Sequence, residues 1–248
     1  MTQTFPGAVL VTGANGGLGS RLVAGLLESG HTDIACHYRS SNDVIAPLLA
    51  SHGLDPEHHL FRAELTDEGQ VQALARSVQA RFGRVWGVVN IAGGSSNGMS
   101  WKMPSAEFIR ILHANLLSTF LVSREFIPAM REQGGGRIIN VSSVIAHTGV
   151  AGASHYCAAK AGIEGFTRAA AQEVASKGVT VNALALGYFD QGIIADVPEE
   201  LLQTIKARVP VRRLGRSEEL APLVSYLLSE PAAFMTGQVL HLNGGLYS

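Results

Sequence analysis

Residues 8–19 read AVLVTGANGGLG, and this stretch decides the fold class. Its first five residues form a short apolar run, typical of a strand buried on both faces of a parallel sheet. The glycines that follow let the backbone turn sharply, and residues 17–29 then have the pattern of a helix. Such a helix start presents free N–H groups and a positive dipole end, which suit a pyrophosphate. The spacing is G-x-x-x-G-x-G, and a tight turn without a ligand is the alternative interpretation.

Strands and helices alternate along the rest of the chain. We expect strands at 8–12, 33–37, 58–62, 85–90, 137–142, 179–185 and 238–242. We expect helices at 17–29, 42–52, from a cap at Thr66 or Asp67 to Phe82, at 105–112, 113–131 and 155–177, and after Ser217. This order predicts a single-domain, Rossmann-type α/β fold over residues 1–248, with a doubly wound parallel sheet of about seven strands and helices on both faces. Ligands of such folds bind beyond the carboxyl ends of the strands, and the glycine-punctuated stretch 187–213 is expected to be a mobile substrate lid there.

The composition excludes several classes of protein. With 46% hydrophobic and 16% charged residues over 248 positions, the chain can bury a large core and is not expected to be disordered. A net charge of −1 without a basic stripe argues against a nucleic-acid partner. We find no apolar run long enough to span a membrane and no signal peptide. Cys36 and Cys157 suggest neither a disulfide framework nor a metal site, which fits a cytoplasmic protein.

The residues after the second strand bear on the choice of cofactor. In dinucleotide-binding folds an acid at this point holds a ribose 2′-hydroxyl, whereas an arginine accommodates a 2′-phosphate. The sequence here is Arg39-Ser40-Ser41, which favours NADP(H) and leaves NAD(H) open. The alternative is that Arg39 is a solvated loop charge.

Tyr156 and Lys160 lie four residues apart on the helix expected at 155–177, so they share one helix face. A nearby ammonium favours the phenolate and lowers the pKa of a tyrosine, which is ordinarily about 10. A tyrosine tuned in this way can exchange a proton with a carbonyl or alcohol oxygen. Ser143 ends the fifth strand, where its hydroxyl can hydrogen-bond the same oxygen. A Tyr-x-x-x-Lys pair alone is commonly a surface pair, so its joint occurrence with the glycine turn and Ser143 carries the hypothesis.

Six motifs together resemble the short-chain dehydrogenase/reductase family over essentially the whole chain. They are TGANGGLG at 12–19, NIAG at 90–93, Asn115 in HANLLSTF, NVSS at 140–143, YCAAK at 156–160 and TGQVLHLNGG at 236–245. Within the family, the chain is most similar to bacterial 3-oxoacyl-[acyl-carrier-protein] reductases. The resemblance implies a cytoplasmic homotetramer that uses NADPH to reduce a small-molecule or carrier-protein-bound 3-oxoacyl thioester.

The resemblance also implies a role for each matched residue. Tyr156 would be the general acid/base, Ser143 would polarise the substrate oxygen, and Lys160 would bind the nicotinamide ribose. Asn115 would kink its helix and hold a water that continues a proton relay to Lys160. The residues expected to bind the cofactor are Gly13, Asn15, Gly16, Gly17, Leu18, Gly19, Arg39, Ser40, Glu64, Leu65, Asn90, Ala92, Gly93, Tyr156, Lys160, Gly187 and Phe189. Those expected to contact substrate are Ser143, Ile145, His155 and Tyr156.

Four positions depart from the family's usual pattern. Gly16 stands where many NADPH-dependent members have a basic residue, and Ile91 where asparagine is usual. Leu186 replaces a proline, and Gln191 replaces a threonine. These positions bear on how the nicotinamide is held, which cofactor is preferred and which substrate is used.

Two further functions stay open alongside the acyl reductase. The chain can be a dehydrogenase or reductase for another secondary alcohol, such as a polyketide intermediate, a sugar, a steroid or a small diol. It can also be a nucleotide-binding regulator without turnover, since a fold does not fix a function. The intact set of Ser143, Tyr156, Lys160 and Asn115 argues against the regulator.

Overall fold

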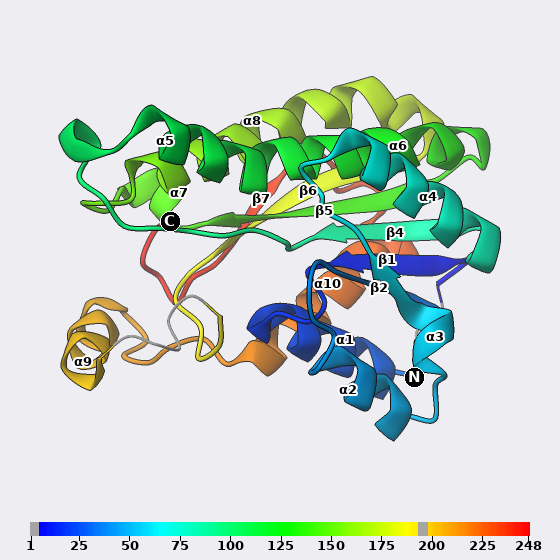
Figure 1. Ribbon diagram of the computed structural model, residues 1–248, viewed down its shortest axis with the longest axis horizontal. Helices are drawn as coiled ribbons and strands as arrows, with labels where there is room; N and C mark the ends of the chain where they lie inside the picture. Colours follow the sequence, from blue (N-terminus) through cyan, green and yellow to red (C-terminus); the bar gives the residue numbers. More distant parts are fainter. Residues whose placement is uncertain (1–4, 193–197) are drawn as a thin grey trace.

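The computed structural model describes residues 5–192 and 198–248. At its centre is a seven-stranded sheet in which all neighbouring strands are parallel (Figure 1). In spatial order the strands are β3 (Leu60–Arg62), β2 (Ile34–Tyr38), β1 (Ala8–Thr12), β4 (Val85–Asn90), β5 (Gly136–Ser143), β6 (Val179–Leu186) and β7 (Val239–Leu242). The order reverses between β1 and β4, which confirms the doubly wound Rossmann-type fold.

Helices cover both faces of the sheet (Figure 1). On one face lie α1 (Gly17–Glu28), α2 (Ile45–Ser51) and α10 (Leu220–Leu228). On the other lie α4 (Glu68–Phe82), α5 (Ser105–Leu112), α6 (Ser118–Glu132) and α8 (Ser154–Val174). Three further helices are α3 (Pro56–His59), α7 (Ile145–Thr148) and α9 (Glu199–Arg208). Among the described residues, no helix combines the length and apolar character that crossing a bilayer requires.

The apolar run of β1 is divided between two hydrophobic cores. Val9 and Val11 pack with α1 and α10, whereas Leu10 packs with α4, α6 and α8 on the opposite face. All three side chains are fully buried. Burial of an aliphatic side chain of this size stabilises the folded state by about 1.5–3 kcal/mol relative to exposure. A continuous apolar run, rather than an alternating one, is therefore what a strand covered on both faces requires.

Several element boundaries differ from the sequence prediction, and each has a local cause. Asp55 accepts a hydrogen bond from the backbone of Glu57, and Pro56 occupies the first helical position, so 56–59 form α3 and the third strand begins at Leu60. Helix α4 is capped by Asp67, whose side chain accepts from the Gln70 backbone N–H. Thr66 was the other cap candidate, but its hydroxyl instead donates to Glu64.

The stretch 187–213 is more regular than predicted, because it contains helix α9. Residues 193–197 of this stretch lie outside the described residues. Whether 187–213 acts as a mobile lid stays a prediction.

The two helices predicted at 105–112 and 113–131 are continuous with each other. A π-helical turn at His113–Leu117 joins α5 to α6. Ser118 donates to the Ala114 and Asn115 carbonyls, and Thr119 also donates to the Asn115 carbonyl. These side chains pair with backbone oxygens at the turn, where the regular helical bonding changes.

Candidate active site

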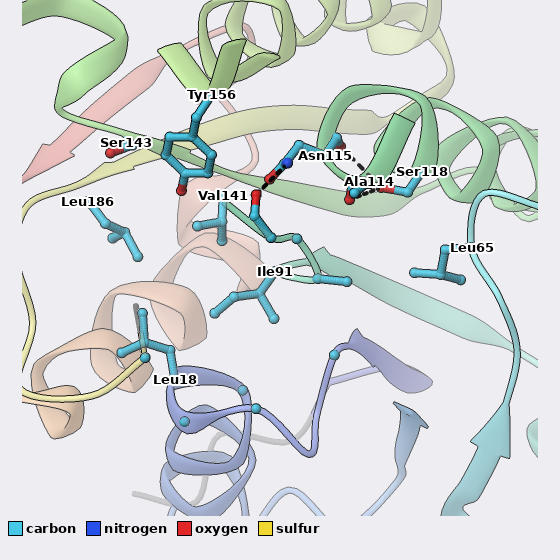
Figure 2. Close-up of a pocket in the computed structure, with 18 of the residues that line it drawn as sticks. Leu18, Leu65, Ile91, Ala114, Asn115, Ser118, Val141, Ser143, Tyr156 and Leu186 are labelled. Carbon is cyan, nitrogen blue, oxygen red and sulfur yellow. Dashed lines mark hydrogen bonds between the residues drawn. The ribbon is translucent and has the colours of Figure 1, made fainter. Parts of the chain in front are cut away.

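A cleft of about 950 Å³ opens at the carboxyl ends of strands β1 to β6. The glycine turn after β1, the strand ends of β2 and β3, and the loop after β4 form one part of its wall. Ser143 and Tyr156 line another part, beside the loop after β6. Figure 2 shows the Tyr156 ring projecting from α8 into this cleft, with Ser143 on one side and Asn115 on the other. The cleft lies where a doubly wound fold binds its ligands.

The glycine turn leaves no room for side chains at two of its positions. Gly13 has φ +65°, and a Cβ there would lie 2.9 Å from the Ala92 Cα. A Cβ on Gly19 would collide with the Gly13 carbonyl oxygen. Helix α1 then starts at Gly17 with no side-chain cap and no acidic residue in its first turn. The free N–H groups and the dipole of this helix end make the turn suitable for an anion such as a pyrophosphate.

The Asn15 side chain forms hydrogen bonds at the start of helix α2. Its Oδ1 accepts from the backbone N–H groups of Val44 and Ile45, each at 2.9 Å, and its Nδ2 donates to Asp43 at 2.9 Å. Asn15 therefore fixes the start of α2 from a distant part of the sequence, which explains why α2 begins at Ile45 rather than near 42. The residue also lines the cleft, as predicted for a cofactor contact.

Most other residues expected at the cofactor lie on the wall of the cleft. They include Gly16, Gly17, Leu18, Arg39, Ser40, Glu64, Leu65, Ala92, Gly93, Gly187 and Phe189. Asn90 does not, because it is buried below the wall, where its Nδ2 donates to Ser123 and Asn140. Thr12 fixes the loop above it, since its hydroxyl accepts from the backbone N–H groups of Ile91 and Ala92.

The side chains of Lys160 and Asn115 both lie close to Gly93. The Lys160 Nζ donates to the Val141 carbonyl at 2.8 Å, and a Cβ on Gly93 would lie 3.7 Å from that nitrogen. The Asn115 Nδ2 donates to the Gly94 carbonyl at 2.8 Å, whereas its buried Oδ1 has no partner within the described part of the chain. A Cβ on Gly93 would collide with that Oδ1. The arrangement leaves an acceptor free beside an ammonium, which suits a bridging water or hydroxyl.

Burial dominates the electrostatics of the Tyr156–Lys160 pair. It raises the pKa of Tyr156, and the neighbouring Cys157 adds to the rise. Burial also lowers the pKa of Lys160 to about 8. The sequence analysis expected a lowered pKa for Tyr156, and that direction is wrong here, because the burial of the phenol outweighs the influence of the Lys160 Nζ, which lies 5.4 Å from the ring centre and donates to a carbonyl. At neutral pH Tyr156 is thus a neutral phenol, able to donate a proton.

The substrate side holds three of the four residues predicted for it. Ser143, Ile145 and Tyr156 line the cleft, and the backbone N–H of Ile145 points to the Ser143 Oγ at 3.4 Å. His155 is fully buried and does not line the cleft; its Nε2 lies 2.9 Å from the Ser96 Oγ. The reason is helical geometry, because successive residues point about 100° apart, so the neighbour of Tyr156 faces elsewhere.

Sequence reasoning missed Glu164, which lies beneath the cleft. Tyr156, Lys160 and Glu164 follow one another at intervals of four along one face of α8. The Glu164 Oε1 accepts from the Ser142 hydroxyl at 2.7 Å, and the His147 Nε2 lies 2.9 Å away. The sequence did contain a signal: Glu164 is an acidic residue four positions after Lys160, on a helix face that is expected to be buried and therefore apolar.

Comparison with known proteins settles the family. A family model described as Enoyl-(Acyl carrier protein) reductase matches residues 13–247. The chain belongs to the short-chain dehydrogenase/reductase family. As a short-chain dehydrogenase/reductase, it is an NAD(P)-dependent oxidoreductase.

Its curated relatives match over nearly their full length. Nodulation protein G of Azospirillum brasilense is 40% identical over 237 residues, 96% of each chain. The 3-oxoacyl-[acyl-carrier-protein] reductase FabG of Pseudomonas aeruginosa is 35% identical over 239 residues, again 96% of each chain. The protein of that name from Salmonella typhimurium is 35% identical over 248 residues, 99% of each chain.

The positions at which this short-chain dehydrogenase/reductase departs from the expected pattern all line the cleft. Ile91 and Leu186 add two apolar side chains to the lining of the cleft, which also includes Leu18 (Figure 2). Gln191 packs near the start of α1, since a Cβ on Gly17 would lie 3.4 Å from its Cβ. Gly16 differs from Gly13 and Gly19, because a Cβ there would meet only the Gly13 carbonyl, at 3.3 Å.

Proposed function

We propose that this chain reduces a 3-oxoacyl thioester to the 3-hydroxyacyl form, with NADPH as the reductant. The observation that carries the proposal is the convergence of Ser143 and Tyr156 on a cleft that begins at a glycine turn suited to a dinucleotide. The relatives named 3-oxoacyl-[acyl-carrier-protein] reductase support this substrate class. The name of Nodulation protein G states no substrate, so another ketone or secondary alcohol is the alternative.

The residues of the cleft fit a nicotinamide dinucleotide. The start of α1 offers N–H groups to the pyrophosphate, and glycines at positions 13 and 93 leave space that a Cβ would fill. The Asn115 Oδ1, which has no partner among the described residues, and the Lys160 Nζ can receive the ribose end. When bound, the cofactor would supply the hydride that adds to the carbonyl carbon of the substrate.

Tyr156 and Ser143 act on the substrate oxygen in this proposal. As the carbon–oxygen double bond becomes a single bond, the oxygen takes the proton of the Tyr156 hydroxyl. The raised pKa keeps this hydroxyl protonated near neutral pH, as a proton donor must be. The Ser143 hydroxyl donates to the same oxygen and stabilises the charge that develops on it.

Lys160 and Asn115 replace the proton that Tyr156 loses. The Lys160 ammonium would hold the ribose hydroxyls between itself and the phenol. A water on the Asn115 Oδ1 would connect this group to solvent, since the buried Oδ1 otherwise has an unmet capacity to accept.

The proposal of NADPH over NADH rests on Arg39 and Ser40. Both residues are exposed on the wall of the cleft beyond β2. A guanidinium and a hydroxyl at this place would bind a 2′-phosphate.

We also propose a cytoplasmic homotetramer, with residues 187–213 closing over the acyl group. Ile109 on α5 and Phe120 on α6 are 49% and 38% exposed, and their burial would favour pairing of these helices between subunits. Light scattering that shows a monomer would contradict this assembly.

The experiment is to mix the purified protein with acetoacetyl thioester and either NADPH or NADH, and to follow the absorbance of the reduced nicotinamide. Oxidation that is faster with NADPH is the expected result. No oxidation with either cofactor would reject the acyl substrate. A panel of ketones and secondary alcohols then tests the alternative.

A further inference from the structure

His37 on β2 contacts the glycine turn through both its backbone and its ring. Its carbonyl accepts from the Ala14 N–H at 2.8 Å. Its Nδ1 accepts from the Gly13 N–H at 3.0 Å, and its Nε2 lies 3.0 Å from the Ala63 carbonyl at the end of β3. The ring is only 3% exposed and lies on the wall of the cleft. One side chain therefore joins the ends of three adjacent strands where the dinucleotide would lie.

The two partners dictate the protonation state of the ring. The Gly13 N–H can only donate, so Nδ1 must be free of hydrogen. The Ala63 carbonyl can only accept, so the hydrogen must be on Nε2. The neutral Nε2–H form is thus the one form that satisfies both bonds.

We propose that His37 is a positioning residue for the cofactor, and that its neutral imidazole holds the glycine turn in the form that binds the pyrophosphate. A proton on Nδ1 would face the Gly13 N–H, so the bond would break and the turn would lose its support. The inference goes beyond the proposed substrate and rests only on the binding of a nicotinamide dinucleotide.

The surroundings keep the ring neutral near pH 7. Burial lowers the pKa of His37, and the charge of Arg39 acts in the same direction. The Ala63 carbonyl and the charge of Glu64 oppose this shift without reversing it. Because the folded pKa is lowered, the supporting bond is complete above that pKa and is lost as the pH falls through it. Cofactor affinity is therefore expected to decline on the acid side of the ordinary histidine range.

Two substitutions separate the roles of the ring nitrogens. His37→Asn places an amide oxygen near the position of Nδ1, so it keeps an acceptor for the Gly13 N–H but cannot titrate. His37→Leu removes both bonds. The matched control is His59→Gln, because His59 is also a buried histidine with a lowered pKa, yet it bonds to Ile34 and does not line the cleft.

The measurement is the dissociation constant of NADPH and of NADH, without substrate, by nicotinamide fluorescence from pH 8 to pH 5. We expect His37→Leu to bind both about tenfold more weakly at pH 7.5, equivalent to about 1.4 kcal/mol. His37→Asn and His59→Gln should stay within about twofold of the unmodified protein. The unmodified protein and His59→Gln should lose affinity toward pH 5 more steeply than His37→Asn does. NADH, which lacks the titrating 2′-phosphate, provides the cleaner pH profile.

Equal affinities for the three variants at pH 7.5 would overturn the inference, as would parallel pH profiles for the unmodified protein and His37→Asn. If His37→Leu does not fold, the comparison of those two profiles decides. Failure of the proposed function is distinct: a protein that binds a cofactor with the expected pH profile but does not reduce acetoacetyl thioester keeps the role of His37 and loses the acyl substrate.

Discussion

Glu164 and His147 form a 2.9 Å pair that joins the helix of Tyr156 to the segment that follows Ser143. The Glu164 side chain is 5% exposed, and the same Oε1 also accepts from the Ser142 hydroxyl. The His147 ring in turn stacks on Tyr247, with ring centres 4.4 Å apart. The relative placement of Ser143 and Tyr156 thus depends on a buried polar cluster below the cleft.

Replacing Glu164 tests this cluster through stability. Glu164→Leu would leave the His147 N–H without an acceptor and the Ser142 hydroxyl with its longer, 3.2 Å bond to the Lys160 carbonyl, and we expect it to reduce the free energy of unfolding by about 1–3 kcal/mol. Glu164→Gln keeps an Oε1 for both donors and should cost about 1 kcal/mol or less. Urea unfolding measures the free energy of unfolding of both variants. Equal losses would show that the Glu164 carboxylate does not stabilise the protein through these hydrogen bonds.

Tyr156→Phe removes the hydroxyl that the proposal uses as proton donor. We expect kcat to fall by about 10²–10⁴-fold, since that is the usual contribution of a positioned general acid. The dissociation constant of NADPH should change little, because the ring stays in place. Steady-state kinetics and fluorescence titration measure the two quantities, and normal turnover by this variant would exclude Tyr156 as the acid.

Lys160→Met tests the cost of a buried ammonium. The pKa of Lys160 falls from 10.5 to about 8, so folding is penalised by about 3 kcal/mol below pH 8, and this penalty is relieved as the pH rises toward 10.5. The variant should therefore be more stable than the unmodified protein at pH 7, by about 1–3 kcal/mol after loss of the bond to Val141. It should also lose most activity.

The pH dependence supplies the check on this interpretation. The stability difference between Lys160→Met and the unmodified protein should shrink between pH 8 and pH 10 in urea unfolding. A variant that is less stable at pH 7 would mean that the contacts of the ammonium outweigh its desolvation.

Gly93→Ala should damage the cofactor site by steric conflict. The added Cβ would collide with the Asn115 Oδ1 and would lie 3.7 Å from the Lys160 Nζ, and both of these side chains are buried. We expect NADPH to bind at least about tenfold more weakly, as for a loss of about 1.4 kcal/mol or more. Gly165→Ala on α8 is the control, since a Cβ there would meet no atom of residues 5–192 or 198–248 within 4 Å. Equal cofactor affinities for the two variants would refute the steric argument.

Gly16→Arg should increase the preference for NADPH. Gly16 has φ −76° and ψ 163°, a conformation open to any residue, and a Cβ there would lie 3.3 Å from the Gly13 carbonyl oxygen, a tight contact that a small shift of the turn relieves. An added guanidinium near Arg39 would offer a second charge to a 2′-phosphate, so we expect NADPH to bind roughly 3–10-fold more tightly. The affinity for NADH should be unchanged, and a parallel gain for both cofactors would point to an unspecific charge effect.

The alternation of elements and the convergence of the site could be predicted, because both follow from local patterns. The apolar run of β1 and the four-residue spacing of Tyr156 and Lys160 each depend on a single element. What failed depended on distant partners. The start of α2 is set by Asn15, thirty residues before it, and the pKa of Tyr156 is set by burial. No local pattern reports either quantity.

The histidines illustrate the same limit. His155 was expected to contact substrate because it neighbours Tyr156, but its direction on α8 places it against Ser96. His37 stands in a strand where nothing nearby in sequence distinguishes it from a packing residue. Its importance depends on Gly13 and Ala63, which come from two other strands.

The π-helical turn at His113–Leu117 has a consequence for how this chain can be altered. One extra residue in a helical turn offsets everything that precedes it by about 100° around the axis. The inserted position therefore sets how the face of α5 that carries the exposed Ile109 is turned relative to the face of α6 that carries the buried Phe126. Deleting one residue from 113–117 would keep the helical content yet swing α5 around its axis. The number of residues in this turn, more than their identity, therefore determines how α5 is oriented relative to α6.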